Sequence, residues 1–144
     1  MSRLTLEQAS IIVDAALEKG GELGFKPLTV VVLDDGGNMK AMKRQDGSSI
    51  FRPQVALGKA WGAVGMGVPS RQIEKQAKER PYFANALAAA SGGRLVPVAG
   101  GVLVRDAEGA IIGSVGISGD ISDNDETAAI AGIKAAGLTP DPDA

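Results

Sequence analysis

Residues 100–132, GGVLVRDAEGAIIGSVGISGDISDNDETAAIAG, are the stretch from which the fold class can be inferred. Valines and isoleucines on either side of a turn that ends at Gly109 predict two paired strands. Gly113, Gly116 and Gly119 recur along the second strand, where glycine allows another backbone, a ligand or a second subunit to approach closely. Four acids in seven residues then lead into a helix of small residues. We therefore expect the floor of any binding site in this stretch.

The acids at the start of that helix have two interpretations. Ser122 and Asp125 have the spacing of a capping box, and acids at this end of a helix complement its dipole. The alternation of Asp120, Ser122 and Asn124 also resembles a calcium loop. That motif fails because Asp125 stands at the required glycine and Ala131 at the bidentate glutamate. Four acids exceed what capping needs, so we expect at least one to pair with an arginine or to face a ligand.

Length and composition limit the class of protein. The 144 residues predict one domain, residues 1–144, which can bury about two-thirds of its unfolded surface. No apolar run approaches the roughly 20 residues of a membrane span, and the N-terminus has no apolar signal region. A net charge of -2 with one Trp, one Tyr and three Phe gives little to attract or stack nucleic acid. We expect a cytoplasmic protein with no membrane or nucleic-acid partner.

The chain contains no cysteine and no histidine. Disulfides, Cys/His zinc sites and a Ser-His-Asp triad are therefore excluded, and we expect no metal site. Proton transfer would have to use carboxylates, lysine, tyrosine or water. Nine Lys or Arg lie in residues 40–80, whereas residues 120–144 contain six acids and Lys134 as their one cation. Either these two regions face one another, or the basic region is a candidate anion site.

Local patterns predict the remaining elements. Thr5 and Gln8 have capping-box spacing before an amphipathic first helix. Residues 28–33 and 39–44 flank the turn DDGGN and are expected to pair as strands. The other expected elements are a glycine- and alanine-rich helix at 53–66, a charged helix capped by Ser70, a short helix at 82–90, a strand at 95–99 and a frayed tail at 139–144. This order predicts an α+β fold, an antiparallel sheet of about five strands flanked by helices, as in profilin- or PAS-like α/β sandwiches.

Lys59 is the cation that local sequence explains least. It lies in the expected helix at 53–66, where most residues on one side are glycine or alanine. Gly58 before it suggests a phosphate-binding loop, but Pro53 stands where that motif needs glycine and Ala60 replaces the Ser or Thr that holds magnesium. We expect Lys59 to pair with a carboxylate or to be a candidate general base.

Four ordered blocks resemble a known family: VVLDDGGNMKAMKRQDG, GKAWGAVGMGVPS, AGGVLVRDAEGAIIGSVGISG and DNDETAAIAG. They are similar to haem-binding-like proteins of the HbpS and GlcG type, a family that includes the C-terminal domain of certain corrinoid adenosyltransferases. The resemblance covers residues 4–138. It implies an α/β sandwich that assembles into dimers and often octamers, with tetrapyrrole binding in some members.

The resemblance also implies which residues form the site. By position, the matching residues are Arg44, Asp46, Gly47, Lys59, Gly100, Gly101, Gly116, Ser118, Gly119 and Asp125. Together with the residues singled out above, the candidate ligand-binding set is Arg44, Asp46, Arg52, Lys59, Gly100, Gly101, Ser118 and Asp120. Two positions differ from the family pattern, since Leu103 replaces a frequent proline and Gln45 a usual apolar residue.

The absence of histidine removes the commonest axial ligand of haem iron. The iron could instead be held by Tyr82, Met66 or a hydroxyl group. Alternatively, a porphyrin could bind through its propionates to Arg44, Arg52 or Lys59. Haem is therefore a candidate ligand whose mode of binding the sequence leaves open.

Three functions are consistent with these patterns. The first is a small-ligand-binding oligomer, in which an apolar wall and arginines hold a carboxylate-bearing molecule such as haem. The second is an enzyme, a lyase or isomerase, in which Arg44 or Arg52 clamps a small carboxylate and Lys59 or Asp125 moves a proton. The third is a structural subunit, because glycine-rich helices and turns also suit self-association.

Overall fold

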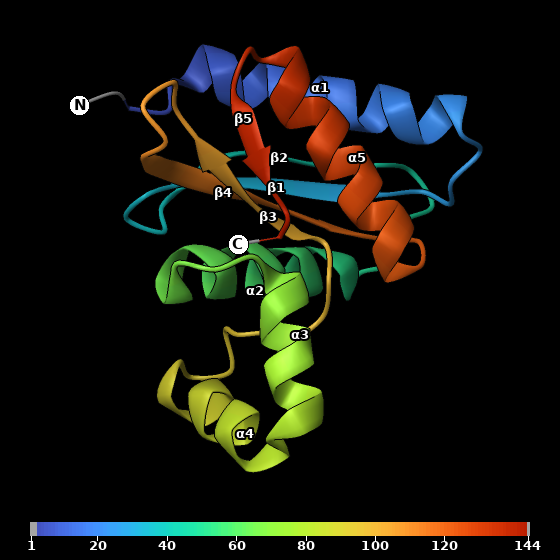
Figure 1. Ribbon diagram of the computed structural model, residues 1–144. Coiled ribbons are helices and arrows are strands. Elements are labelled where there is room, and N and C mark those ends of the chain that lie inside the picture. Colours follow the sequence, from blue (N-terminus) through green and yellow to red (C-terminus); the bar gives the residue numbers. More distant parts are fainter. Residues whose placement is uncertain (1–2, 144) are drawn as a thin grey trace.

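The computed structural model describes residues 3–143 (Figure 1). Its elements are α1 (Leu6–Glu22), β1 (Thr29–Asp34), β2 (Met39–Arg44), α2 (Arg52–Met66), α3 (Ser70–Glu79), α4 (Pro81–Ala90), β3 (Gly101–Arg105), β4 (Ile111–Ser118), α5 (Ser122–Ala135) and β5 (Thr139–Asp141). The strands form one antiparallel sheet in the order β2-β1-β4-β3-β5. The predicted α+β fold is confirmed.

Helices cover both faces of the sheet. Figure 1 shows α1 and α5 on one face and α2 on the other, with α3 and α4 projecting beyond α2. Alternate residues of β1 divide between these layers: Val30 and Val32 join the core beneath α1 and α5, whereas Val31 packs against α2. The central strands β1, β3 and β4 are therefore buried on both faces, which explains their nearly continuous runs of apolar and small residues.

Helix α2 lies in backbone contact with the sheet. A Cβ atom added to Gly116 would lie 2.0 Å from the carbonyl oxygen of Ala56, and one added to Gly101 would lie 2.4 Å from that of Lys59. No side chain fits at either strand position without moving the helix. The element for which these glycines leave room is therefore α2 of the same chain.

Two segments differ from the sequence-based prediction. The expected frayed tail is wrong for residues 139–141, which form β5 beside β3 and are stabilised by an ion pair of 2.7 Å between Arg105 Nε and Asp141 Oδ2. The expected strand at 95–99 does not form. Instead, the Ala99 N–H donates to Glu74 Oε1, and the Val96 N–H donates to the carbonyl of Gly58. Local strand propensity was overridden because α2 and α3 supply these partners.

Two of the three predicted caps are also wrong. The box of Thr5 and Gln8 is confirmed, with both hydrogen bonds at 3.0 Å. Ser70 does not cap α3, since it is the first helical residue and its hydroxyl accepts a hydrogen bond of 2.6 Å from the Gly101 N–H. Ser122 does not cap α5, and Asp125 is drawn away from the expected box by partners elsewhere in the fold.

The close contact of α2 makes Gly116→Ala a test of the fold. The new methyl group would overlap the Ala56 carbonyl, so we expect a loss of about 3 kcal/mol or more in the free energy of unfolding. Urea unfolding followed by circular dichroism measures this loss. As the matched control, Gly21→Ala in α1 meets no atom within 4 Å and should stabilise the protein by about 0.5–1 kcal/mol. Equal stability of the two variants would contradict the packing described.

Candidate functional site

The predicted site residues form two neighbouring groups. Arg52, Lys59, Ser118, Asp120 and Asp125 gather where α2 begins, β4 ends and α5 begins, and we call this group the polar network. Arg44 and Asp46 instead line a hollow on the other side of the segment 25–28. Gly100 and Gly101 lie beneath α2, beside Lys59.

A buried ion pair lies at the centre of the polar network. Lys59 Nζ lies 3.1 Å from Asp125 Oδ2 and donates a hydrogen bond of 2.9 Å to the carbonyl of Ile117. The other oxygen, Asp125 Oδ1, accepts a hydrogen bond of 3.0 Å from the Asp120 N–H. Lys59 is 2% exposed and Asp125 is fully buried. Each charge therefore has internal partners and is closed off from solvent.

Gly100 is required by the position of the ammonium group. Its φ of +123° favours glycine, and an added Cβ would lie 2.8 Å from Lys59 Nζ and 3.0 Å from the carbonyl oxygen of Ile117. A side chain here would displace the ion pair. The predicted involvement of Gly100 and Gly101 is thus explained by the room that they leave for the side chain and backbone of Lys59.

Burial dominates the electrostatics of this pair. Removal from water lowers the pKa of Lys59, although the charge of Asp125 acts in the opposite direction. Burial likewise raises the pKa of Asp125, although the positive charge of Lys59 acts to lower it. Desolvation is the largest effect on both groups, so the pair fixes geometry more than it stabilises the fold.

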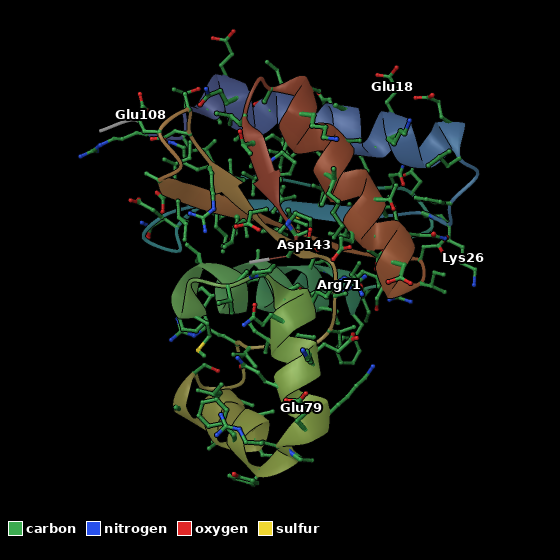
Figure 2. The ribbon with its side chains drawn as sticks, in the orientation of Figure 1. Glu18, Lys26, Arg71, Glu79, Glu108 and Asp143 are labelled. Carbon is green, nitrogen blue, oxygen red and sulfur yellow. The ribbon has the colours of Figure 1, made fainter. Side chains whose placement is uncertain are left out.

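The other members of the network are also tied to the backbone. Asp120 Oδ2 accepts a hydrogen bond of 2.8 Å from the Lys26 N–H, while its Oδ1 accepts from the Ile121 N–H and from the Asn124 side chain. These hydrogen bonds lower the pKa of Asp120, and the bond from the Lys26 N–H has the largest effect. Figure 2 shows Lys26 beside the first turn of α5. Asp120 therefore anchors the segment that separates the polar network from the hollow.

A polar row on the α2 face connects the two groups. Arg52 Nη1 donates a hydrogen bond of 3.0 Å to Ser118 Oγ, and Ser118 lies opposite Thr29 in the sheet. Thr29 Oγ1 lies 2.9 Å from Ser48 Oγ, and Arg44 Nη1 donates 2.6 Å to the Ser48 carbonyl. The two arginines thus lie at the two ends of the same row of polar residues.

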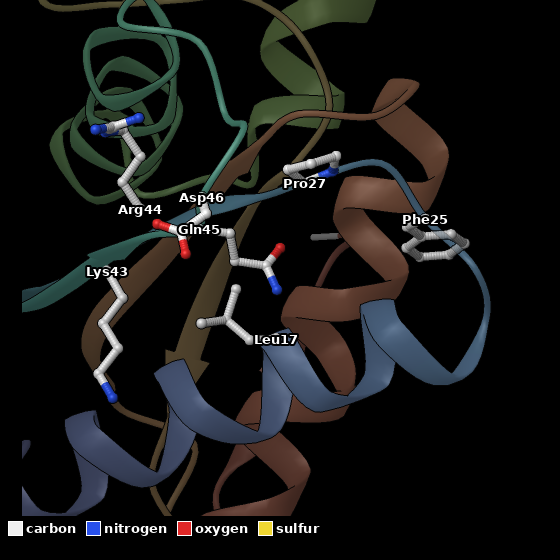
Figure 3. Close-up of a pocket in the computed structure, with 7 residues that line it drawn as sticks. All are labelled: Leu17, Phe25, Pro27, Lys43, Arg44, Gln45 and Asp46. Carbon is white, nitrogen blue, oxygen red and sulfur yellow. The ribbon is translucent and has the colours of Figure 1, made fainter.

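The hollow has a volume of about 590 Å³ and lies between α1 and the end of β2 (Figure 3). It is lined by Leu17, Phe25, Pro27, Lys43, Arg44, Gln45 and Asp46. Figure 3 shows Lys43 directed toward α1, where its Nζ lies 2.8 Å from Asp14, whereas Arg44 extends toward α2. Gln45 Oε1 accepts a hydrogen bond of 2.7 Å from the Leu28 N–H. The hollow therefore has an apolar wall and a rim that carries both charges, Lys43 and Asp46, while the guanidinium of Arg44 lies at its edge on the α2 side of β2.

Most of the hollow was missed by sequence reasoning. Leu17 belongs to the amphipathic first helix, for which no site role was predicted, and Phe25 and Pro27 lie in a segment without a recognisable motif. Besides the predicted Arg44 and Asp46, the one signal was Gln45, which departs from the pattern of the family that the sequence resembles. Its side chain now has a definite role, because it holds the backbone of Leu28 beside the hollow.

The basic and acidic regions of the chain do face one another. Arg71 on α3 pairs with Asp123 and, at 2.9 Å, with Glu126 on α5, and these bonds raise the pKa of Arg71 (Figure 2). Lys59 and Asp125 form a second contact between the same regions. The expectation that one of the four acids pairs with an arginine is confirmed. Within residues 3–143, no group of side chains is arranged to hold a metal ion, and no helix has the length and apolar character of a membrane crossing.

A comparison with protein-family models identifies the family of this chain. A family model described as haem-degrading protein HbpS-like matches residues 4–134. The chain belongs to this HbpS-like family. The resemblance inferred from the four sequence blocks is thereby confirmed. Among curated proteins, none matches the chain significantly in sequence.

Solved structures share the fold of this HbpS-like chain. The complex of PduOC with haem has a TM-score of 0.85 and 25% identity, and the match covers 95% of this chain and 97% of that one. HbpS has a TM-score of 0.79 and 30% identity, with 93% and 90% covered. The protein ORFY of Klebsiella pneumoniae has a TM-score of 0.85 at 24% identity, with 95% and 93% covered, and supports the fold alone.

The buried pair predicts strongly non-additive effects on stability. Asp125→Asn keeps an acceptor for the Asp120 N–H but leaves Lys59 without its countercharge, so we expect a loss of about 3–5 kcal/mol. Lys59→Met should be similarly destabilising because Asp125 is left buried and unpaired. The double variant should lose clearly less than the sum of the two. Urea unfolding of all four proteins measures this coupling, and additive losses would contradict it.

Proposed function

We propose that this protein binds a small carboxylate-bearing molecule in the hollow between α1 and β2. The single observation that supports this most is the composition of the hollow, in which three apolar side chains form a wall and polar and charged residues, among them Arg44, form the rim. A volume of about 590 Å³ falls within the usual range of ligand pockets, roughly 300–1,000 Å³. An apolar molecule with a terminal carboxylate matches both surfaces.

Arg44 is the proposed anchor for the carboxylate, which would reach its guanidinium at the edge of the hollow, because that group extends from the end of β2 toward α2. Only its Nη1 is hydrogen-bonded within residues 3–143, to the Ser48 carbonyl, so Nη2 and Nε remain available to a ligand. Lys43 also lines the hollow, but its charge is paired with that of Asp14. Arg52 lies further along the same polar row and could bind a second carboxylate of a larger ligand.

Haem is the candidate ligand that the family supports, because a haem complex of PduOC shares this fold. The apolar wall of the hollow suits the ring of haem, and Arg44 at its edge suits a propionate. It does not contain Tyr82 or Met66, the iron ligands considered from sequence, and the chain has no histidine. We therefore propose that haem, if it is the ligand, is held by its propionates and its ring rather than by a strong axial ligand.

The polar network has a positioning role in this proposal. The contact of Asp120 with Lys26 and that of Gln45 with Leu28 hold the segment 25–28 from its two sides. Lys59 and Asp125 in turn fix the start of α5, from which Asp120 is placed. The alternative of an enzyme with Lys59 or Asp125 as the proton-transfer group rests on their shifted pKa values. Such an enzyme would need an opening through which a substrate reaches the pair, whereas Lys59 is only 2% exposed and Asp125 is 0% exposed.

A haemin titration tests the proposed ligand. Saturable binding should give a shifted Soret band, and Arg44→Gln should weaken it about tenfold through loss of a charge-assisted hydrogen bond. As a matched control, Lys134→Gln removes one positive charge from an exposed position on α5 and should leave the affinity unchanged. Weak and non-saturating absorbance changes would exclude haem, and equal affinities of the two variants would exclude Arg44 as the anchor.

We also propose that the protein self-associates through α4. This helix has the sequence PYFANALAAA, yet only Ala84 among its ten residues is buried, and Tyr82 is 71% exposed. An apolar helix so exposed is expected to be covered by a partner. A second copy is proposed because the family resemblance implies dimers or octamers. The cytoplasmic location expected from the sequence stays a prediction.

Light scattering after size-exclusion chromatography tests this assembly. We expect a mass that is a multiple of the 14.6 kDa chain. Ala86→Glu places a charge on the exposed side of α4 and should shift the protein to the monomer. Ala135→Glu makes the same change at an exposed position of α5 and should not. A monomeric wild type, or an assembly that tolerates Ala86→Glu, would contradict the proposal.

A further inference from the structure

A second and smaller depression lies on the opposite side of α2 from the sheet. We call it the apolar groove, and its volume is about 190 Å³. Its walls include Trp61, Met66, Leu87 and Leu95, and its floor includes Gly62 and Gly65. It lies between α2, α4 and the loop that follows α4 (Figure 1). None of these residues belongs to the hollow or to the polar network.

The floor of the groove leaves one edge of the Trp61 indole ring open at Gly65. A Cβ atom added to Gly65 would lie 3.8 Å from Trp61 Cζ3, an ordinary contact distance, and would meet no other residue within 4 Å. Glycine inside a helix is destabilising by about 1 kcal/mol relative to alanine. Helix packing does not require Gly65, unlike Gly58, whose Cβ would lie 2.4 Å from Val96 Cγ2.

One cation, Arg94, lies next to the groove and contacts two of the residues that line it. The guanidinium carbon of Arg94 lies 4.2 Å from the centroid of the Trp61 ring. Arg94 Nε donates a hydrogen bond of 2.8 Å to the carbonyl of Ser91, which itself lines the groove. The Arg94 N–H also donates to Ser91 Oγ at 3.1 Å. Within residues 3–143, Nη1 and Nη2 of Arg94 have no hydrogen-bond partner.

From these observations we propose that the apolar groove binds a monocarboxylate with a single aromatic ring. The ring would lie against the open edge of Trp61 and the leucines, and the carboxylate would accept hydrogen bonds from Nη1 and Nη2 of Arg94. The groove is close in size to cavities of about 150 Å³ that hold benzene, and it is too small for a tetrapyrrole. Charge complementarity with Arg94 selects an acid over a neutral ring.

Trp61 is the one tryptophan of the chain and therefore reports directly on the groove. Titration of the full chain with benzoate should change the Trp61 fluorescence to a saturating value. Benzamide, a neutral molecule of the same shape, should bind about tenfold more weakly because it lacks the charge that Arg94 recognises. Arg94→Gln should weaken benzoate about tenfold and leave benzamide unchanged.

A substitution at the floor separates the groove from other surfaces. Gly65→Leu should fill the groove and abolish the response to both probes, while Gly65→Ala should retain it, and circular dichroism verifies that both variants fold. Amide chemical shifts should move at residues 61–66 and 94. Shifts confined to residues 43–46 would place benzoate in the hollow instead and overturn this proposal without affecting the proposed function there.

Three other results would also overturn the inference. Binding of benzoate that is unchanged in Arg94→Gln would exclude the arginine as the anchor. Binding that persists in Gly65→Leu would exclude the groove as the site. Trp61 fluorescence that depends on protein concentration and does not respond to benzoate would show that a side chain of a second copy occupies the groove. If haemin does not bind in the hollow, these results can still be interpreted. They depend on Trp61 and Arg94, which are not part of the hollow.

Discussion

The contact of the α2 backbone with the two central strands is the constraint on which the rest of the structure depends. The carbonyl oxygens of Ala56 and Lys59 occupy the space that side chains at residues 116 and 101 would otherwise fill. Because α2 lies so close, the Lys59 side chain reaches past Gly100 to Asp125 at the start of α5. One close approach therefore fixes the layer order and also places the buried ion pair that joins the two faces of the sheet.

The parts of the fold that were predicted from sequence are those with local causes. The two hairpins follow from β-branched runs around glycine-containing turns, and α1 follows from its periodicity and its capping box. The errors at Ser70, at Asp125 of the expected capping box and at residues 95–99 share another cause. In each case a partner distant in sequence, such as the Gly101 N–H for Ser70, satisfies a group that local rules assigned to a cap or a strand. Residues 139–141 form a strand for the same reason, since β3 offers them an open edge.

The candidate site was predictable to the extent that chemistry restricts residue type. A lysine in a helix of small residues is unusual enough to imply a carboxylate partner, and Asp125 is that partner. The hollow has no such signal, because Leu17, Phe25 and Pro27 are ordinary residues that tertiary packing brings together. The groove beside Trp61 likewise depends on where α4 and the following loop lie. A pocket made of common residues has no sequence signature, whereas a buried charge does.

The distribution of charge argues for binding rather than proton transfer as the main role of the polar residues. Lys59 and Asp125 have the shifted pKa values of a catalytic pair, yet their polar atoms bond to each other and to the backbone. Arg44 and Arg94 differ from this pair because both are exposed. Each guanidinium donates one hydrogen bond to a backbone carbonyl, and its other nitrogens remain available to a ligand. A guanidinium oriented in this way is ordered before a ligand arrives, so less entropy is lost when a carboxylate binds. The buried pair determines where the elements lie, and the exposed arginines present the charges that a ligand can reach.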